Sequence, residues 1–185
     1  MIRRAIIGLA LFLAAAVFAA ASAAAVYTYR HYVVHLAAVD AIIRELPREE
    51  AFPPETVANT ISRLATPGLN WSVARNLVSE LYPQPIRMLD WHLRGFLWER
   101  LLPHHLTRAE MLGLYFHFMP FEGGRGLAYG ARHYYGKAPN ELTQREGLEL
   151  FVISQSPRGY SPTENPKRFR EAVERAVARL GAPEA

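Results

Sequence analysis

The chain has 185 residues, of which 50% are hydrophobic and 21% charged, a composition that excludes a disordered chain and suits about one domain. It has no cysteine, which excludes disulfides, thiolate metal sites and a cysteine nucleophile. The formal net charge of +4 suits anionic partners such as phospholipid headgroups or pyrophosphates. There is no lysine-rich block and no nucleic-acid-binding motif, so we expect no nucleic-acid partner.

The N-terminal segment is long and apolar. Arg3 and Arg4 precede an uncharged run over residues 5–26, which is about long enough to cross a membrane as a helix. Basic residues before such a run predict that residues 1–4 are cytoplasmic and that the rest lies on the far side. The alternative is a cleaved secretory signal, because "ASA" at residues 21–23 is a small-residue cleavage pattern. The length of the run favours a retained single-pass anchor, and both interpretations predict an exported chain.

The next segment, residues 27–69, is predicted to be a stalk of helices and loops. Residues 27–46 have apolar residues at roughly helical spacing and continue as an amphipathic helix. Pro47, Pro53 and Pro54 indicate a loop. Residues 55–65 indicate a short helix and "TPGLN" a turn, after which Asn70 can cap the next helix.

The remainder of the chain is predicted to be a series of helices. They are expected near residues 70–81, 86–101, 108–118, 143–154 and 166–180, and "YPQP" separates the first two. The second of these helices is expected to end at Pro103. Its apolar residues recur at steps of three and four, as is typical of an amphipathic helix: Leu89, Leu93, Phe96, Leu97 and Leu101.

Two helix starts have the spacing of a capping box, Thr107 with Glu110 and Thr143 with Glu146. We find no convincing strand and no internal repeat. The predicted fold class is therefore all-α, with one irregular domain over residues 70–181 on one transmembrane helix.

An ordered set of motifs occupies residues 107–169. The stretch "LTRAEMLGLYFHFMPFEGGRGLAYGARH" is followed by "YYGK", "LTQREG" and "SPRGYSPTENP". The set resembles the second half of the peptidoglycan glycosyltransferase, or transglycosylase, domain of bifunctional penicillin-binding proteins and their monofunctional relatives. The resemblance covers about residues 70–169. It implies a lysozyme-like helical fold and the polymerisation of lipid II with release of undecaprenyl pyrophosphate.

Two arginines at family positions are the candidates for contacts with the lipid pyrophosphate. "VARNL" stands where the family has "LAKNL", so Arg75 takes the place of the lysine that contacts the pyrophosphate. "RMLDW" stands where the family has "RKxxE", and Arg87 retains the arginine. Guanidinium groups bind phosphate in a bidentate fork. Helix-surface arginines with no ligand are the alternative interpretation.

The upstream motifs depart from the family pattern in their polar residues. The paired glutamines before "LAKNL" are replaced by Trp71 and Ser72. In "RMLDW", Met88 replaces the lysine and Trp91 the glutamate. These departures put the family's catalysis in doubt and favour a weakly active or inactive protein.

The family's general base is the glutamate of an "EDxxFxxH" motif. "REEAFPPE" here has a glutamate pair and Phe52 but no histidine in place, and it lies closer to "VARNL" than the family spacing. Glu50 is our candidate for the base. Glu99 is expected to support the site by holding its helix through a buried hydrogen bond or ion pair. The other expected structural residues are Gly123, Gly124 and Gly126, which let the chain turn and pack closely, and Lys137 of "YYGK".

No cofactor is predicted, and the histidines His104, His105, His117 and His133 lack metal-ligand spacing. A divalent metal is chemically possible at a pyrophosphate, but no ligand is assigned. The expected partners are lipid II or nascent glycan, the bacterial inner membrane and cell-wall synthesis proteins.

Three functions remain open at this point. The first is a divergent membrane-bound peptidoglycan glycosyltransferase. The second is a non-catalytic relative that binds lipid-linked substrate, glycan or a synthesis partner. The third is an exported helical protein whose likeness is architectural only. The lost polar residues favour the second.

Overall fold

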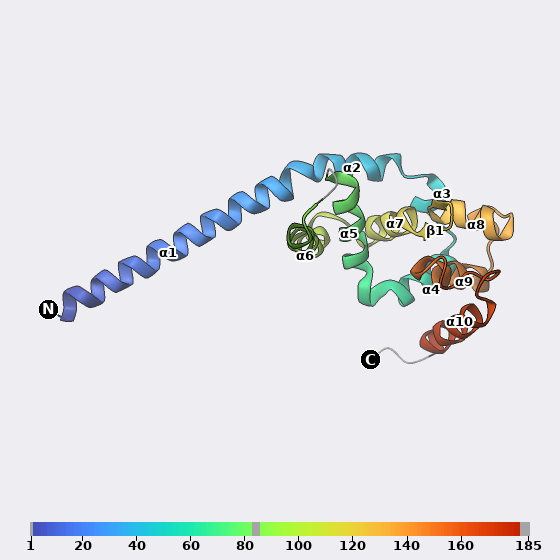
Figure 1. Cartoon of the computed structure of the whole chain (residues 1–185). Helices are drawn as coiled ribbons and strands as arrows, with labels where there is room; N and C mark the ends of the chain where they lie inside the picture. Colours follow the sequence, from blue (N-terminus) through green and yellow to red (C-terminus); the bar gives the residue numbers. More distant parts are fainter. Residues whose placement is uncertain (1, 83–85, 182–185) are drawn as a thin grey trace. The chain divides into compact units, whose positions relative to one another are not determined.

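A computed structural model of the chain describes residues 2–82 and 86–181 (Figure 1). It divides into two compact units, one up to Val39 and one from Asp40 onward. The fold is all-α, as predicted, apart from one very short hairpin. The expected break at residues 82–85 begins where α5 ends, at Leu81, and residues 83–85 lie outside the described part.

The first unit is dominated by α1 (Ile2–His31), which is followed by the 3₁₀ turn η1 (Val33–His35) and by the first residues of α2 (Leu36–Glu45), a helix whose residues from Asp40 onward belong to the second unit. The uninterrupted helix expected over residues 27–46 was wrong, because 3₁₀ geometry interrupts it after Tyr32. Apolar side chains such as Phe12 and Phe18 are exposed along α1. Within the described residues, the stretch Ile6–Glu45 is long and apolar enough to cross a membrane. A retained anchor and a signal sequence both meet this criterion.

The second unit consists of helices of very different lengths. They are α3 (Arg48–Ala51), α4 (Glu55–Ala65), α5 (Leu69–Leu81), α6 (Met88–His105), α7 (Arg108–Phe118), α8 (Leu127–Tyr135), α9 (Gln144–Gln155) and α10 (Pro166–Gly181), with 3₁₀ turns η2 (Thr66–Gly68) and η3 (Pro139–Glu141). The bounds of α5, α7, α9 and α10 agree with the sequence-based ranges to within a residue or two. Local signals therefore place most helices correctly.

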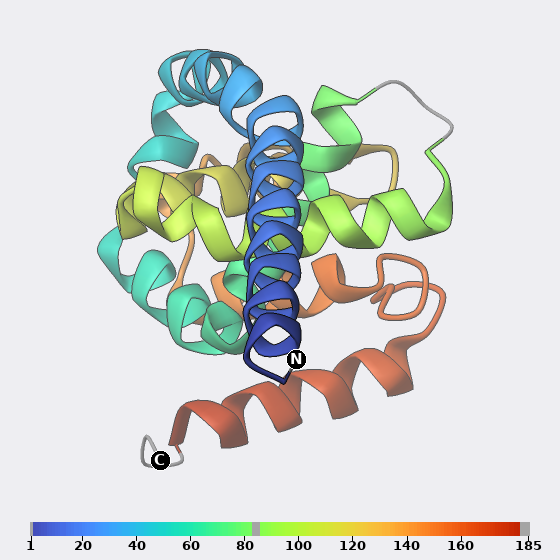
Figure 2. The ribbon, with the colours of Figure 1, turned by 90° about the vertical axis from the view of Figure 1, so that its left-hand side faces the viewer.

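The core of this unit lies around α7 and α9. α5 packs against α6 and α7, and α4 packs against α9. Phe116, Leu150 and Ile153 are almost completely buried there. The apolar run "GLYFHFMPF" is thus mainly core. α10 lies along the edge of the unit, against α9 and α4 (Figure 2).

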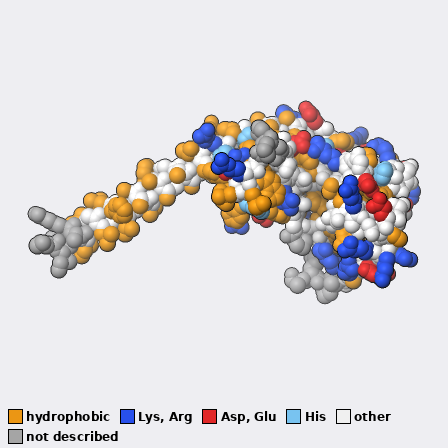
Figure 3. Space-filling model, viewed as in Figure 1, with side chains coloured by type: hydrophobic (Ala, Val, Ile, Leu, Met, Phe, Trp, Pro, Cys, Tyr) orange, Lys and Arg blue, Asp and Glu red, His pale blue; other side chains and the backbone are white. Residues whose placement is uncertain are grey.

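Helix α6 faces the core with a different stripe from the one that its periodicity suggests. Leu89 is 71% exposed and Phe96 62%, and Figure 3 shows hydrophobic side chains gathered over α6. The buried face instead carries Gly95, Trp98 and Leu102. A Cβ on Gly95 would lie 3.1 Å from the Trp71 ring, so the small residue lets α6 approach α5.

The predicted end of α6 at Pro103 was also wrong, because the helix continues to His105. A proline in the last turn removes only one backbone hydrogen bond. The neighbouring bond from the Leu106 N–H to the Leu102 carbonyl, 2.8 Å long, remains. Burial of Leu102 holds this last turn in place.

Three further local predictions were wrong. Asn70 is not the cap of α5, since η2 leads directly into the helix and Gly68 occupies the cap position. The expected loop around Pro47 contains the one-turn helix α3. The strands β1 (Pro120–Phe121) and β2 (Gly124–Arg125) form an antiparallel hairpin, which is too short to show a period-2 pattern.

Both predicted capping boxes are confirmed. The Thr107 Oγ1 accepts from the Glu110 N–H at 3.3 Å, and Glu110 Oε2 accepts from the Thr107 N–H at 2.8 Å. The same reciprocal bonds join Thr143 and Glu146, at 3.2 and 2.8 Å. These bonds satisfy backbone donors that the helix itself cannot pair.

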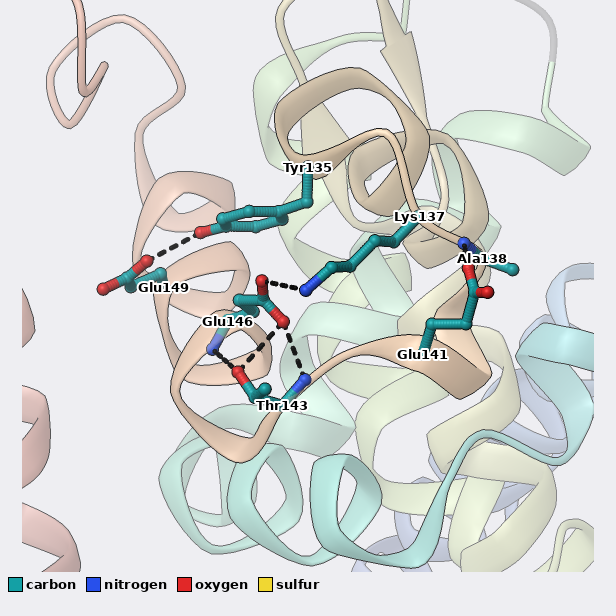
Figure 4. A network of polar contacts seen from close by, with 7 residues as sticks. All are labelled: Tyr135, Lys137, Ala138, Glu141, Thr143, Glu146 and Glu149. Carbon is teal, nitrogen blue, oxygen red and sulfur yellow. Dashed lines mark hydrogen bonds and ion pairs between the residues drawn. The ribbon is translucent and has the colours of Figure 1, made fainter.

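The start of α9 is also tied to the end of α8 (Figure 4). Lys137 Nζ lies 2.6 Å from Glu146 Oε1, and the Tyr135 hydroxyl donates to Glu149 Oε2 at 2.8 Å. The hydrogen bond from Lys137, and then that from the Thr143 N–H, lower the pKa of Glu146. Burial, and then the bond to Glu149, raise the pKa of Tyr135. Lys137 thus links "YYGK" to "LTQREG" in space.

Removing the α9 cap should destabilise the fold measurably. We expect Thr143→Ala to lower the free energy of unfolding by about 0.5–2 kcal/mol, because an N–H of the first turn loses its acceptor. Urea denaturation followed by circular dichroism measures this. Gln144→Ala, one residue further along and exposed, is the matched control and should change little. Equal stabilities of the two variants would contradict the role of the cap.

Stability should also depend on pH through Glu146. The pKa of Glu146 is lowered in the folded protein. Its contribution to the stability of the fold is therefore present above the pKa of an unfolded glutamate, and it is lost as the pH falls through the pKa in the folded protein. We expect Lys137→Met to lower the free energy of unfolding at pH 7 by about 0.2–1 kcal/mol, with the deficit shrinking below about pH 4. Urea titrations across this range test it. The control variant Lys167→Met, at an exposed position on α10, should show no deficit in the free energy of unfolding that shrinks at low pH.

Candidate functional site

The glycine-rich turn after α7 is shaped by two side chains that press against it. Gly126 has φ +97°, and a Cβ at this position would collide with Glu50 Oε1. A Cβ on Gly124 would lie 2.6 Å from the Tyr129 ring. The chain therefore needs glycine here both for backbone conformation and for close approach.

Glu50 lies inside the fold, on α3, which packs against α7 and α8 (Figure 1). The residue is 3% exposed. Its Oε2 lies 2.8 Å from His117 Nδ1, and its Oε1 accepts from the Ala128 N–H at 3.4 Å in the first turn of α8. Both carboxylate oxygens thus have partners, and the candidate base is a buried link between three helices.

The pair of Glu50 and His117 lines a surface pocket of about 570 Å³, which we call the His117 pocket. His117, unlike Glu50, is partly open to solvent, with 25% of its side chain exposed. The other residues that line the His117 pocket are Pro47, Arg125, Ala128, Tyr129, Arg132 and His133. The rings of Tyr129 and His133 are stacked, with centroids 5.4 Å apart and planes at 12°.

Both arginines of the His117 pocket are already paired with carboxylates. Arg125 Nη1 lies 2.7 Å from Glu80 Oε2, and this hydrogen bond lowers the pKa of Glu80. Arg132 Nη2 lies 2.9 Å from Glu49 Oε2. The pocket therefore carries little uncompensated positive charge.

A second hollow, the Arg75 cleft, has a volume of about 300 Å³ and is lined by Arg75 and Trp91. The Arg75 guanidinium carbon lies 4.8 Å from the centre of the Trp91 ring and 5.9 Å from that of Trp71. The cleft's polar groups are mainly hydroxyls and amides, from Ser72, Asn76, Ser79, Tyr115, Ser154 and Gln155. The described residues that line it include no carboxylate.

The structure does not bring all the candidate residues together. Arg87 is exposed just before α6 and is not among the described residues that line the Arg75 cleft. Glu99 is half-buried on α6 and lines a separate hollow with Asn70 and Arg100. Glu50 belongs to the His117 pocket. The structure leaves the assigned roles of these residues as predictions.

The sequence patterns excluded His117 as a metal ligand and did not indicate its contact with Glu50. Its partner Glu50 is 67 positions away, and no local pattern connects the two. Among the described residues, no three side chains of the metal-binding types His, Cys, Asp and Glu come together. We therefore assign no metal ligands.

Comparison with known proteins places the chain in a family. Residues 72–181 match the family described as Transglycosylase. The chain is 34% identical over 110 residues to penicillin-binding protein 1C of Escherichia coli K12, across 55% of this chain and 14% of that protein. It is 35% identical over 80 residues to a protein of Cupriavidus necator that is named as a transglycosylase, across 40% of this chain and 35% of that protein. Because the family match covers more than half of the sequence, the chain belongs to the transglycosylase family.

Proposed function

We propose that the chain is a membrane-anchored, peptidoglycan glycosyltransferase-like protein of cell-wall biogenesis. On this proposal it binds lipid II or nascent glycan at the outer surface of a bacterial inner membrane, and it polymerises the substrate slowly or not at all. Family membership and the long apolar stretch Ile6–Glu45 support the general assignment. The observation that carries the finer proposal is the composition of the Arg75 cleft.

The proposed reaction makes two chemical demands on the protein. A base must take the proton of the acceptor hydroxyl as its oxygen attacks the anomeric carbon. Cationic groups must stabilise the pyrophosphate that leaves with the bonding electrons. The Arg75 cleft offers one guanidinium and, among its described lining, no carboxylate. Binding is therefore better supported than rapid transfer.

Arg75 is suited to hold the leaving pyrophosphate. Its guanidinium faces Trp91, and within the described residues it makes no hydrogen bond or ion pair. A cation–π contact uses the face of the group and leaves the N–H edges free to donate. These edges can form the bidentate fork that phosphate oxygens accept.

A non-catalytic binder of the same substrate is the second candidate function. Trp91 in the wall of the Arg75 cleft and the neutral hydroxyl and amide groups around it favour this alternative. An aromatic ring and neutral hydrogen-bonding groups suit recognition of a ligand better than acid–base chemistry.

Binding should depend on Arg75. We expect Arg75→Ala to weaken binding of undecaprenyl pyrophosphate to the full chain in nanodiscs by roughly ten- to a hundredfold, because charge-assisted hydrogen bonds are worth about 1.5–3 kcal/mol. Equilibrium titration measures the affinity, with Arg168→Ala, exposed on α10, as the control. Unchanged affinity in a double Arg75→Ala, Arg87→Ala variant would remove the proposed anion site.

The same preparation, given lipid II, should polymerise it slowly at most. The Arg75 cleft has no carboxylate in its described lining, and general acid–base catalysis by such a group typically contributes about 10²–10⁴-fold in rate. Gel analysis of glycan chains provides the measurement, with a monofunctional family member as the positive control. Rapid synthesis of long glycan by the isolated protein would overturn the proposed weak activity while leaving the family assignment intact.

The proposed topology can be tested separately. We expect a reporter fused after residue 185 to be active if it functions only outside the cytoplasm, and inactive if it functions only inside. A mature N-terminus near residue 24 would exclude the retained anchor but not export.

A further inference from the structure

The Glu50–His117 pair fixes which imidazole nitrogen carries the proton. Glu50 Oε2 lies 2.8 Å from His117 Nδ1, and a carboxylate can only accept a hydrogen bond. Nδ1 is then the donor, and in the neutral ring Nε2 keeps its lone pair. Glu50 cannot rotate away, since Oε1 accepts from the Ala128 N–H and Gly126 closes over it.

The other imidazole nitrogen of His117, Nε2, is available to accept a proton. Within the described residues it has no hydrogen-bond partner, while the side chain is 25% exposed and lines the His117 pocket. The guanidinium groups of that pocket are each engaged by a carboxylate. The pocket thus suits a neutral hydroxyl better than a second phosphate.

The His117 pocket and the Arg75 cleft are lined by consecutive residues at the end of α7. His117 lines the pocket and Phe118, the next residue, lines the cleft. The Arg125 guanidinium carbon lies 5.5 Å from the centre of the Phe118 ring, and Arg125 itself faces the pocket. The contact between Arg125 and Phe118 thus joins a wall of the pocket to a wall of the cleft.

We propose that His117, and not Glu50, is the proton-accepting group of this chain, and that Glu50 is the residue that positions it. The inference rests on the proposed function. Nε2 takes the proton from the acceptor hydroxyl as that oxygen bonds to the anomeric carbon. The bond from this carbon to the pyrophosphate oxygen breaks, the pyrophosphate leaves with the electron pair, and the imidazolium returns its proton to water.

The tautomer of His117 is the first test. The full chain in nanodiscs, labelled with ¹⁵N-histidine, is compared with His117→Gln to assign the ring signals among the seven histidines. We expect the neutral ring to carry its proton on Nδ1. A proton on Nε2 would overturn the proposal, and this measurement needs neither a variant of Glu50 nor any activity.

The second test is the slow turnover of lipid II. We expect His117→Gln to lower the rate by about 10²-fold or more. Glu50→Gln should lower it by up to about 10⁴-fold, because an amide that donates to Nδ1 selects the unreactive tautomer. His104→Gln, exposed on α6, should leave the rate unchanged. Circular dichroism shows whether Glu50→Gln has folded.

These results separate this inference from the function on which it rests. A wild-type rate no higher than that of His117→Gln, including no turnover in either, overturns the role of His117. Affinity for undecaprenyl pyrophosphate reports on Arg75 and should be the same in wild type and His117→Gln. If the wild-type chain does not bind undecaprenyl pyrophosphate, the proposed function itself is overturned.

Discussion

The buried carboxylate of Glu50 holds together the part of the fold that carries the site. Removing a carboxylate from water costs several kcal/mol unless partners compensate for the lost hydration. His117 and the Ala128 N–H supply that compensation from α7 and α8. The partners are available only because Gly126 lets the turn approach the carboxylate closely. One interaction thereby fixes α3, the end of α7 and the start of α8.

The same interaction determines what the site can do. A carboxylate with both oxygens occupied and 3% exposure is poorly placed to take a proton from a substrate. The imidazole it holds is partly exposed, and on our proposal His117 takes the proton in place of Glu50. Meanwhile the Arg75 cleft contains a cation and an aromatic wall without a carboxylate in its described lining. On our proposals, ligand binding at Arg75 and proton transfer at His117 use neighbouring hollows.

Interactions within a few residues of the chain could be predicted from the sequence. The capping boxes at Thr107 and Thr143 place the starts of α7 and α9, because each joins residues three positions apart. The glycine-rich turn was expected to approach something closely, and the ordered motifs over residues 107–169 indicated the family that the comparison confirms. Each of these signals is contained in a contiguous stretch.

Only the tertiary structure decided which distant residues meet. Glu50 and His117 are 67 positions apart, and their contact depends on how α3 packs against α7. On α6, periodicity favoured the stripe of Leu89 and Phe96, yet packing on α5 buries Trp98. A helix with apolar residues around much of its circumference leaves its buried face to be chosen by its neighbours. Sequence therefore determined the local elements and the family, while packing selected the buried faces and assembled the candidate site.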